Sequence, residues 1–245
     1  MTQNESAKLG TTTTDIVTSL AKGTTGAIPI VGSMIAEIIG NVIPNQRVER
    51  IVRFVKELED RLGKLEAENL QAKVADPAVV DLLEDAFIQA SRATSEDRIT
   101  HIAEVIANGI TSDELNEAEV KRMLWLLGQL NDAEIVILRS RLAITREDMQ
   151  SDSAFREQHA MLLAPDATHL GSTKDKFEEA ALKASYRQHL HDLGLLRHRY
   201  TKPKRGELPD FDEKTGMMTT SGSDVTRLGQ MFLCCLNVIP NWYKR

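Results

Sequence analysis

Residues 76–109 read DPAVVDLLEDAFIQASRATSEDRITHIAEVIANG, and this stretch predicts two consecutive helices. Asp76 followed by proline is typical of a helix start, because an aspartate side chain caps free backbone amides and proline fits the first helical position. Thr94 and Asp97 form a capping-box pattern that opens the second helix, and Gly109 is typical of a residue that ends one. Apolar residues recur at helical spacing in both segments, so we expect a helical core.

Helical spacing continues on both sides of this stretch. On its N-terminal side, apolar residues alternate three and four positions apart, which is coiled-coil spacing. They are Val48, Ile51, Val55, Leu58, Leu62 and Leu65. This seam is too short for a free-standing coiled coil, so we expect it to pair with another helix of the same fold. On the C-terminal side, Asn116 and Asn131 each begin a predicted helix.

The hydrophobic period changes in the C-terminal part of the chain. The predicted elements there are a helix at 153–163 within an irregular insertion or hinge at 145–173, a helix at 174–193, strands at 195–200 and 216–220, and a last helix at 225–236. The expected fold class is therefore mainly α, a helical bundle followed by a winged-helix-like α+β module with a small β-hairpin.

Composition and charge agree with a folded helical protein of two regions. The chain has 245 residues, of which 42% are hydrophobic and only 4% aromatic, which favours helix packing over a sandwich or barrel. Residues 1–151 carry 16 basic against 24 acidic side chains, and residues 152–245 carry 14 against 12. We interpret 1–14 as a disordered tail, 15–112 as an N-terminal helical region, and 113–245 as a second helical region that contains the module.

Two stretches in the middle of the chain resemble a known protein group. They are ASRATSEDRITHIAEVIANGI at 90–110 and LLGQLNDAEIVIL at 126–138. Together they resemble helical proteins of the bacterial abortive-infection alpha group, although the tryptophan often seen in the first helix of that group is absent at residues 102–104. The resemblance implies a bacterial phage-defence function and brings no catalytic residues with it.

Two later stretches resemble the second half of a winged helix. They are YRQHLHDLGLL at 186–196 and TRLGQMFL at 226–233. In that fold a helix ends at a Leu-Gly-Leu-Leu turn into a hairpin wing, and a Thr-x-x-Gly start opens the following helix. The resemblance covers 176–236, and the matching first half would be the helices at 117–130 and 133–142.

Sequence patterns for catalysis and metal binding are absent. Gly23-Thr-Thr-Gly26 lacks the lysine of a P-loop, and the six histidines form no His-Glu-x-x-His pattern. His189 and His191 are two apart on a predicted helix, so we expect them to face different ways. Cys234 and Cys235 are too few for a disulfide framework, and no export signal opens the chain. We expect a non-enzyme in the cytoplasm or peripheral at the inner membrane, with no cofactor, metal or small-molecule substrate.

A first functional signal lies in the apolar segment 26–43. Gly32, Ala36 and Gly40 place a small residue at every fourth position, with Ile35 and Ile39 between them. Such spacing lets helices approach closely and is favoured where helices associate in lipid. The helix spans about 14 residues, or roughly 21 Å, which is too short for a hydrocarbon core of about 30 Å. The segment is therefore either a close-packed helix of the bundle or a self-associating, membrane-perturbing one.

A second signal is a set of basic residues at the expected recognition helix and wing. The set is Lys183, Arg187, Arg197, Arg199, Lys202, Lys204 and Arg205. These side chains could contact nucleic-acid phosphates, or they could form a solvated basic face that docks on the acidic half of a partner copy. Acidic residues at the expected wing tip argue against deep entry into a groove.

These observations lead to three hypotheses. The first is a non-enzymatic phage-defence protein of the abortive-infection kind, which acts through self-association and membrane perturbation by its N-terminal apolar segment. The alternative is a winged-helix transcriptional regulator that binds DNA, and the third is a helical interaction scaffold. The expected partners are accordingly a second copy of the chain, another protein, a membrane surface or DNA.

Overall fold

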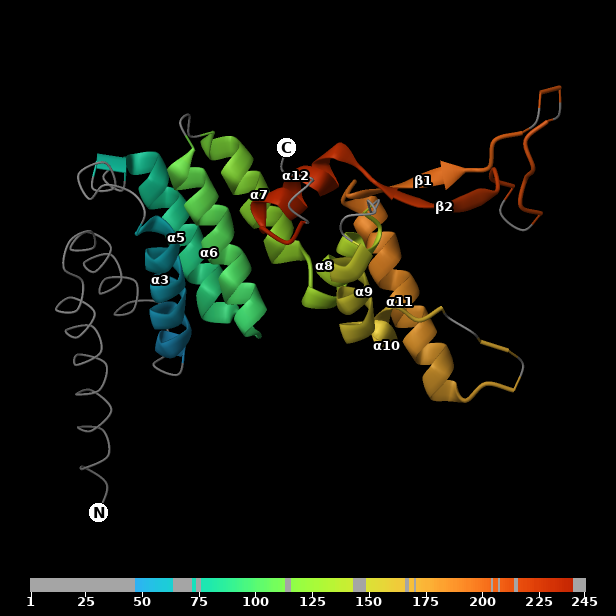
Figure 1. Cartoon of the computed structure of the whole chain (residues 1–245), viewed down its shortest axis with the longest axis horizontal. Helices are drawn as coiled ribbons and strands as arrows, with labels where there is room; N and C mark the ends of the chain where they lie inside the picture. The colour runs from blue at the N-terminus through green and yellow to red at the C-terminus, as the bar shows by residue number, and fades with distance from the viewer. Residues whose placement is uncertain are drawn as a thin grey trace, which may run out of the picture. The chain divides into compact units, whose positions relative to one another are not determined.

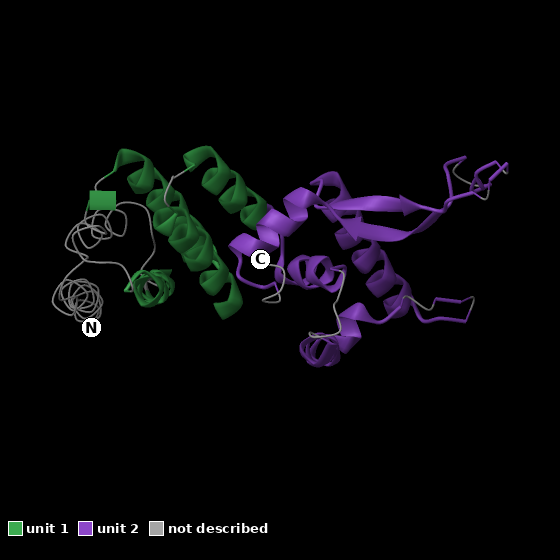
Figure 2. Cartoon of the chain, turned by 45° about the horizontal axis from the view of Figure 1, so that its top comes forward, with its two compact units in different colours: residues 1–128 green, residues 129–245 purple. Residues whose placement is uncertain are grey.

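The computed structural model describes most of the chain from Arg47 onward (Figure 1). The described residues are 47–63, 72–73, 76–112, 116–142, 149–165, 168–169, 171–203, 205–206, 208–213 and 216–239. Within these ranges the chain is mainly helical, with nine helices and one two-stranded antiparallel sheet. The mainly α fold with a small C-terminal hairpin, expected from the sequence, is confirmed. The chain divides into two compact units, residues 1–128 and 129–245 (Figure 2).

Unit 1 is built from helices that share one apolar core. They are α3 (Val48–Leu62), α5 (Pro77–Arg92), α6 (Glu96–Thr111) and α7 (Glu117–Gln129), the last of which ends at the unit boundary. Helix α3 packs against α5 and α6. The seam residues Ile51, Val55, Leu58 and Leu62 are buried there, whereas Leu65 and the side chain of Val48 lie outside the described residues. The ring of Phe54 meets that of Phe87 edge-on at 5.4 Å.

Polar side chains cap the starts of α5 and α6 in unit 1. The Asp76 carboxylate accepts a hydrogen bond from the Ala78 amide at 3.0 Å, as the sequence predicts. Helix α6 is capped by Ser95, whose hydroxyl accepts from the Arg98 amide at 3.1 Å. The predicted cap at Thr94 is therefore wrong by one residue. Neighbouring hydroxyl residues look alike in sequence, and only the extended backbone at Ser95 shows which one begins the helix.

Gly109 does not end α6, which continues to Thr111. A Cβ atom at Gly109 would lie 2.8 Å from Cγ2 of Val120, so the missing side chain lets α6 and α7 approach closely. The carbonyl groups of Ile110 and Ser112, at the true end of the helix, accept hydrogen bonds from the Lys73 amine. The prediction of a glycine cap was wrong because close packing and helix termination both favour glycine.

Unit 2 combines short helices with the hairpin. Its elements are α8 (Asp132–Ser140), α9 (Met149–Gln158), α10 (Ala160–Leu163), α11 (Lys174–Asp192), β1 (Leu196–Tyr200), β2 (Thr220–Val225) and α12 (Arg227–Cys235). Helix α11 packs against α8 and β1, and α12 packs against β2. Leu138, Leu190, Leu195, Phe232 and Leu233 are fully buried in this unit. The strands β1 and β2 project from these helices (Figure 1).

Two predicted elements of unit 2 differ in the structure. The helix predicted at 153–163 is two helices, because the chain leaves helical geometry at His159. The returning strand is Thr220–Val225 rather than 216–220, and at the far turn only Phe211 and Met218 form an isolated bridge. The strand sequence TSGSDV is polar and contains glycine, so nothing in its composition predicts a strand, and pairing with β1 forms it.

The turn from α11 into the hairpin is tied to the start of α12. Gly194 adopts the left-handed conformation with φ of 72° and ends α11. The Thr226 hydroxyl donates to the Gly194 carbonyl at 2.7 Å and accepts from the Gly229 amide at 3.1 Å. The Leu-Gly-Leu-Leu turn and the Thr-x-x-Gly helix start expected from the sequence are both present.

We predict that alanine substitutions at two glycines of unit 1 change the free energy of unfolding differently. Gly109→Ala should lower the free energy of unfolding by about 1–3 kcal/mol, because the added methyl group overlaps Val120. Gly128→Ala is the matched control, since its Cβ would meet Gln89 at an ordinary 3.6 Å, and it should leave stability equal or raise it by up to about 1 kcal/mol. Urea unfolding followed by circular dichroism measures both. A Gly109→Ala protein as stable as Gly128→Ala would disprove the close-approach interpretation.

Candidate functional site

The predicted basic set divides into an exposed part and a buried part. Arg197 and Arg199 lie exposed on β1, Lys202 and Arg205 are exposed in the chain beyond it, and Arg187 is half-buried on α11. Lys204 lies outside the described residues. The structure therefore brings most of the set to the hairpin and to the adjoining end of α11.

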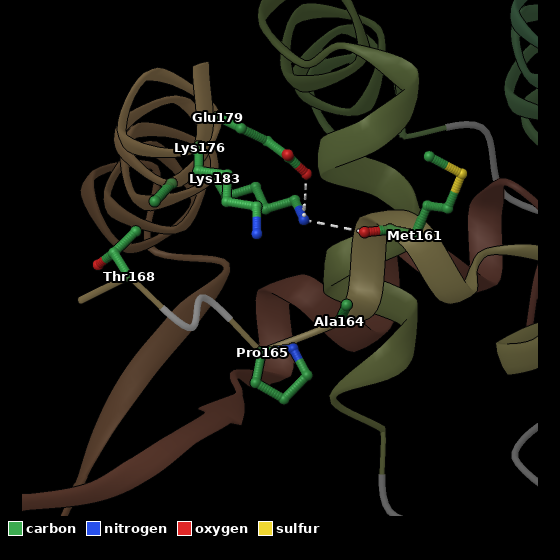
Figure 3. A pocket seen from close by; sticks show the side chains of 8 residues that line it. Met161, Ala164, Pro165, Thr168, Lys176, Glu179 and Lys183 are labelled. Atoms are coloured by element: carbon green, nitrogen blue, oxygen red, sulfur yellow. Dashed lines mark hydrogen bonds and ion pairs between the residues drawn. The ribbon is translucent and has the colours of Figure 1, made fainter. Parts of the chain in front are cut away.

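Lys183 does not belong to the exposed part. Its side chain is 9% exposed, and its Nζ donates to the Met161 carbonyl at 2.9 Å and pairs with Glu179 Oε1 at 2.8 Å (Figure 3). Met161 lies in α10, so this amine fastens α11 to α10 beside a hollow of about 260 Å³. Lys183 thus serves packing within unit 2 and is not available on the surface as a phosphate contact.

Arg141, which sequence reasoning missed, lies within electrostatic reach of Arg187, Arg156 and Arg199. Burial lowers the pKa of its guanidinium, and the positive charges of Arg187, Arg156 and Arg199 lower that pKa further. These four residues come from the end of α8 and from α9, α11 and β1. Because like charges repel, the fold holds this arginine cluster together against an electrostatic cost that a bound anion would relieve.

The members of the arginine cluster differ in whether an acidic side chain pairs with them. Arg156 pairs with Asp152 at 2.5 Å and donates to the Ser140 carbonyl. Arg199 pairs with Asp224 at 3.1 Å. The charges that act on the pKa of Arg141 are all cationic among the residues that the structure describes. Arg141 thus differs from Arg156 and Arg199, each of which has a carboxylate partner.

A glycine in the opposite strand of the hairpin leaves room for the Arg199 side chain. In the antiparallel register Arg199 lies opposite Gly222, and a Cβ there would lie 2.9 Å from the Arg199 guanidinium. The register shifts between Arg199 and Tyr200, which is a β-bulge. Arg197 and Arg199 are two apart on one strand, so they share a face of the hairpin, and His198 lies on the other.

A pair of histidines joins α11 to the hairpin. The rings of His191 and His198 stack with centroids 3.9 Å apart and an angle of 10° between their planes. The Nε2 atom of His191 lies 3.0 Å from the Ser223 hydroxyl of β2. Burial lowers the pKa of His191, and His198 and Arg141 lower it further, against Asp192 and a backbone hydrogen bond with Leu196, which raise it. Both strands are thus tied to the last turn of α11 through His191.

His189 faces the other way, as its spacing from His191 predicts. Its Nδ1 lies 2.7 Å from Oε1 of Glu134, which is 3% exposed. The other oxygen of Glu134 accepts from the Asn131 amide at 2.7 Å and completes the capping box of α8. This carboxylate fixes α11 against α8 and thereby positions Arg187 and His191 relative to Arg141.

Other predicted features receive no structural description. Gly32, Ala36 and Gly40, with Ile35 and Ile39, lie outside the described residues. Within the described ranges, no cluster of three or more His, Cys, Asp or Glu side chains could hold a metal ion. None of the helices in those ranges is sufficiently long and apolar to cross a bilayer.

Comparison with protein-family models, with curated proteins and with solved structures found no match to this chain.

We predict that stability depends on pH through His191. Its folded pKa lies below the unfolded value of about 6.5, so the unfolded chain binds the proton more readily. The stabilising contribution is present above that pH and is lost as the pH falls through the folded pKa. The urea midpoint should fall between about pH 7 and pH 5.5, and less steeply in His191→Gln than in the parent. His169→Gln, at an exposed loop position, should follow the parent. Identical curves for His191→Gln and the parent would contradict this assignment.

Proposed function

We propose that this chain is a non-enzymatic bacterial phage-defence protein of the abortive-infection kind, and that its unit 2 is a winged-helix-type module that contacts nucleic-acid phosphates. The observation that carries the phosphate contact is the arginine cluster, in which Arg187 of α11 and Arg199 of β1 both act on the charge of Arg141 at the end of α8. Cationic side chains gathered in this way, with one poorly compensated, suit a polyanionic ligand.

The order of elements in unit 2 supports a winged-helix-type module. Helix α11 packs on α8, ends at Gly194 and leads into the β1–β2 hairpin, after which the chain returns through Thr226 into α12. In this arrangement α11 corresponds to a recognition helix and the hairpin to a wing. The departure is that α9, α10 and their connections intervene between α8 and α11.

Charge along the hairpin indicates where nucleic acid would lie. Arg197 and Arg199 are near its base, whereas Asp210, Asp212 and Glu213 lie near its far turn. Acidic side chains repel phosphates, so we infer that contact is confined to the base of the hairpin and the adjoining arginine cluster. Such a footprint engages the backbone and reads little sequence.

The two stretches that resemble the abortive-infection group include helix starts and a close contact between helices. Residues 90–110 span the Ser95 cap and the close approach at Gly109, and residues 126–138 contain the capping box of Asn131 and Glu134. These are packing and capping positions rather than reactive groups. Within this proposal, unit 1 is the helical scaffold.

For the effector step we propose self-association and membrane perturbation by residues 26–43. This part of the proposal stands on the sequence alone, through the small residues at Gly32, Ala36 and Gly40. A sensor that binds nucleic acid and an effector segment that acts on lipid would together make a defence protein.

The phosphate contact is tested by the salt dependence of DNA binding. Arg141→Gln should weaken binding to a duplex of about 20 base pairs several-fold and lower the slope of log K against log salt by about 1, because one phosphate contact is lost. Arg122→Gln removes the same charge from an exposed site of unit 1 and should change neither quantity. Fluorescence anisotropy measures both. Equal slopes for the two variants would exclude the arginine cluster as the contact.

The effector step is tested by leakage from liposomes and by growth of expressing cells. Gly32→Leu and Gly40→Leu should reduce dye release and toxicity, because bulky side chains keep the segments apart. Gly171→Leu, in a loop of unit 2, is the control and should behave as the parent. Unchanged toxicity in both N-terminal variants, or a parent protein without toxicity, would count against the effector role.

A further inference from the structure

We propose that the hairpin arm, residues 196–225, binds the same arm of a second copy of this chain, with the two arms side by side in opposite directions. In this pair the acidic far end of each arm lies against the basic base of the other. The inference goes beyond the proposed function, because it adds an interaction surface separate from residues 26–43 and does not depend on the phosphate contact.

The arm extends further than the strands β1 and β2. Beyond the bulge, the Thr201 amide donates to the Thr219 carbonyl at 3.1 Å, and the Thr219 amide donates to the Asp210 carbonyl at 2.9 Å. Thr219 thus bonds to both sides of the loop that leaves the ladder here. The ladder then continues to a bond of 2.8 Å between the Asp212 amide and the Met217 carbonyl. The arm is therefore an extended ribbon that projects from the helices of unit 2 (Figure 1).

The far end of the arm carries apolar side chains that this chain does not cover. Leu208, Phe211 and Met217 are 87%, 58% and 62% exposed, so three large apolar side chains meet water within a short stretch of sequence. Among the described residues the sheet has two strands, so both are edge strands, which present backbone groups to a further strand. A lone two-stranded ribbon is marginally stable in water, and added strands stabilise it. These features favour a partner that covers the arm.

The charges of the arm fall into two blocks of opposite sign. Residues 197–205 contain five basic and no acidic side chains, and residues 207–213 contain four acidic and no basic ones. Arg197 belongs to the base of the arm, and Asp212 belongs to its far end. A surface of this kind is complementary to a copy of itself that runs in the opposite direction, which is the geometry of a two-fold dimer.

Within one arm, the charges that the ladder holds at its two ends are too far apart to pair. Arg197 lies opposite Asp224. Asp212 is bonded to Met217, seven residues away on the same strand, and the bulge takes up one of these residues. The remaining six steps of about 3.4 Å give about 20 Å, more than twice the Debye length of about 8 Å at physiological salt. In the antiparallel pair of arms the same groups become neighbours.

Sedimentation equilibrium of the full chain tests the arm pair. Every protein in the series carries Gly32→Leu and Gly40→Leu, so that association through residues 26–43 does not contribute. The parent of the series should form a dimer that dissociates on dilution and weakens as salt rises, because its charged contacts are exposed. A parent that stays monomeric at every concentration, or a dimer that salt leaves unchanged, would overturn the proposal.

Exchange of the charges identifies the contact. Asp210→Lys with Glu213→Lys makes the far end basic, and Arg197→Glu with Lys202→Glu makes the base acidic. Each variant alone should dimerise at least about tenfold more weakly than the parent, because like charges then face each other. An equimolar mixture of the two should recover the parent dimer, since each far end then meets a base of opposite sign. A mixture of folded variants that stays monomeric would overturn the arm pair.

A control variant separates the contact from total charge. Glu157→Lys with Asp175→Lys changes two exposed residues on the helices of unit 2 and alters the net charge as much as the far-end variant does. It should leave the dimer unchanged. Dissociation of this control to the same degree as the exchanged variants would count against the arm pair, because net charge alone would then explain the effect.

Phe211→Ser tests the same surface without a change of charge. It should weaken the dimer several-fold, because apolar area that the second arm covers is lost. The side chain is mostly exposed, so this variant carries the test even where circular dichroism shows that an exchanged variant has unfolded. A dimer as stable as the parent's would overturn the proposal. None of these measurements involves nucleic acid, so the phosphate contact stands or falls separately.

Discussion

The peptide unit of Leu195 joins α11 to the start of α12 at the base of the hairpin. Its amide donates to the Leu190 carbonyl in α11, and its own carbonyl accepts from the Thr226 amide at the start of α12. Its side chain is fully buried, and Gly229 of α12 lies so close that a Cβ there would be 2.5 Å from the Leu195 oxygen. The direction in which the hairpin leaves α11 is set at this point. The positions of Arg197, His198 and Arg199 relative to α11 depend on it.

The arginine cluster is stable only because other interactions compensate its repulsion. Unit 2 buries the side chains of Leu138, Leu190 and Phe232, and its buried Glu134 carboxylate contacts His189. The carboxylate of Glu134 also caps α8, so one side chain stabilises a helix start and a helix pair. Repulsion maintained in a folded protein is more often a property of binding sites than of scaffolds.

Local signals in the sequence predicted much of the fold. Caps at Asp76, Asn131 and Thr226 involve side chains and amides two or three residues apart, and the helical period marks which faces are buried. The candidate site was only half predictable, because Arg141 and Arg199 are 58 residues apart in the sequence and come near each other only through the fold. Lys183 was assigned to the surface since α11 has few apolar residues, so its buried side is hard to recognise. The composition of residues 220–225 also gave no signal for a strand, because this segment becomes a strand by pairing with β1.

The bulge between Arg199 and Tyr200 separates the hairpin into a fixed base and an adaptable end. Up to the bulge, pairing of Leu196 with Val225 and of Arg199 with Gly222 determines which residues are opposite each other. Beyond it, extra residues in the connection between 201 and 219 would cost little, because the entropy of closing a loop rises slowly with its length. Length variation among relatives should therefore concentrate in this connection. For the same reason it is the natural point to insert a fluorescent or affinity tag without disturbing the base of the hairpin.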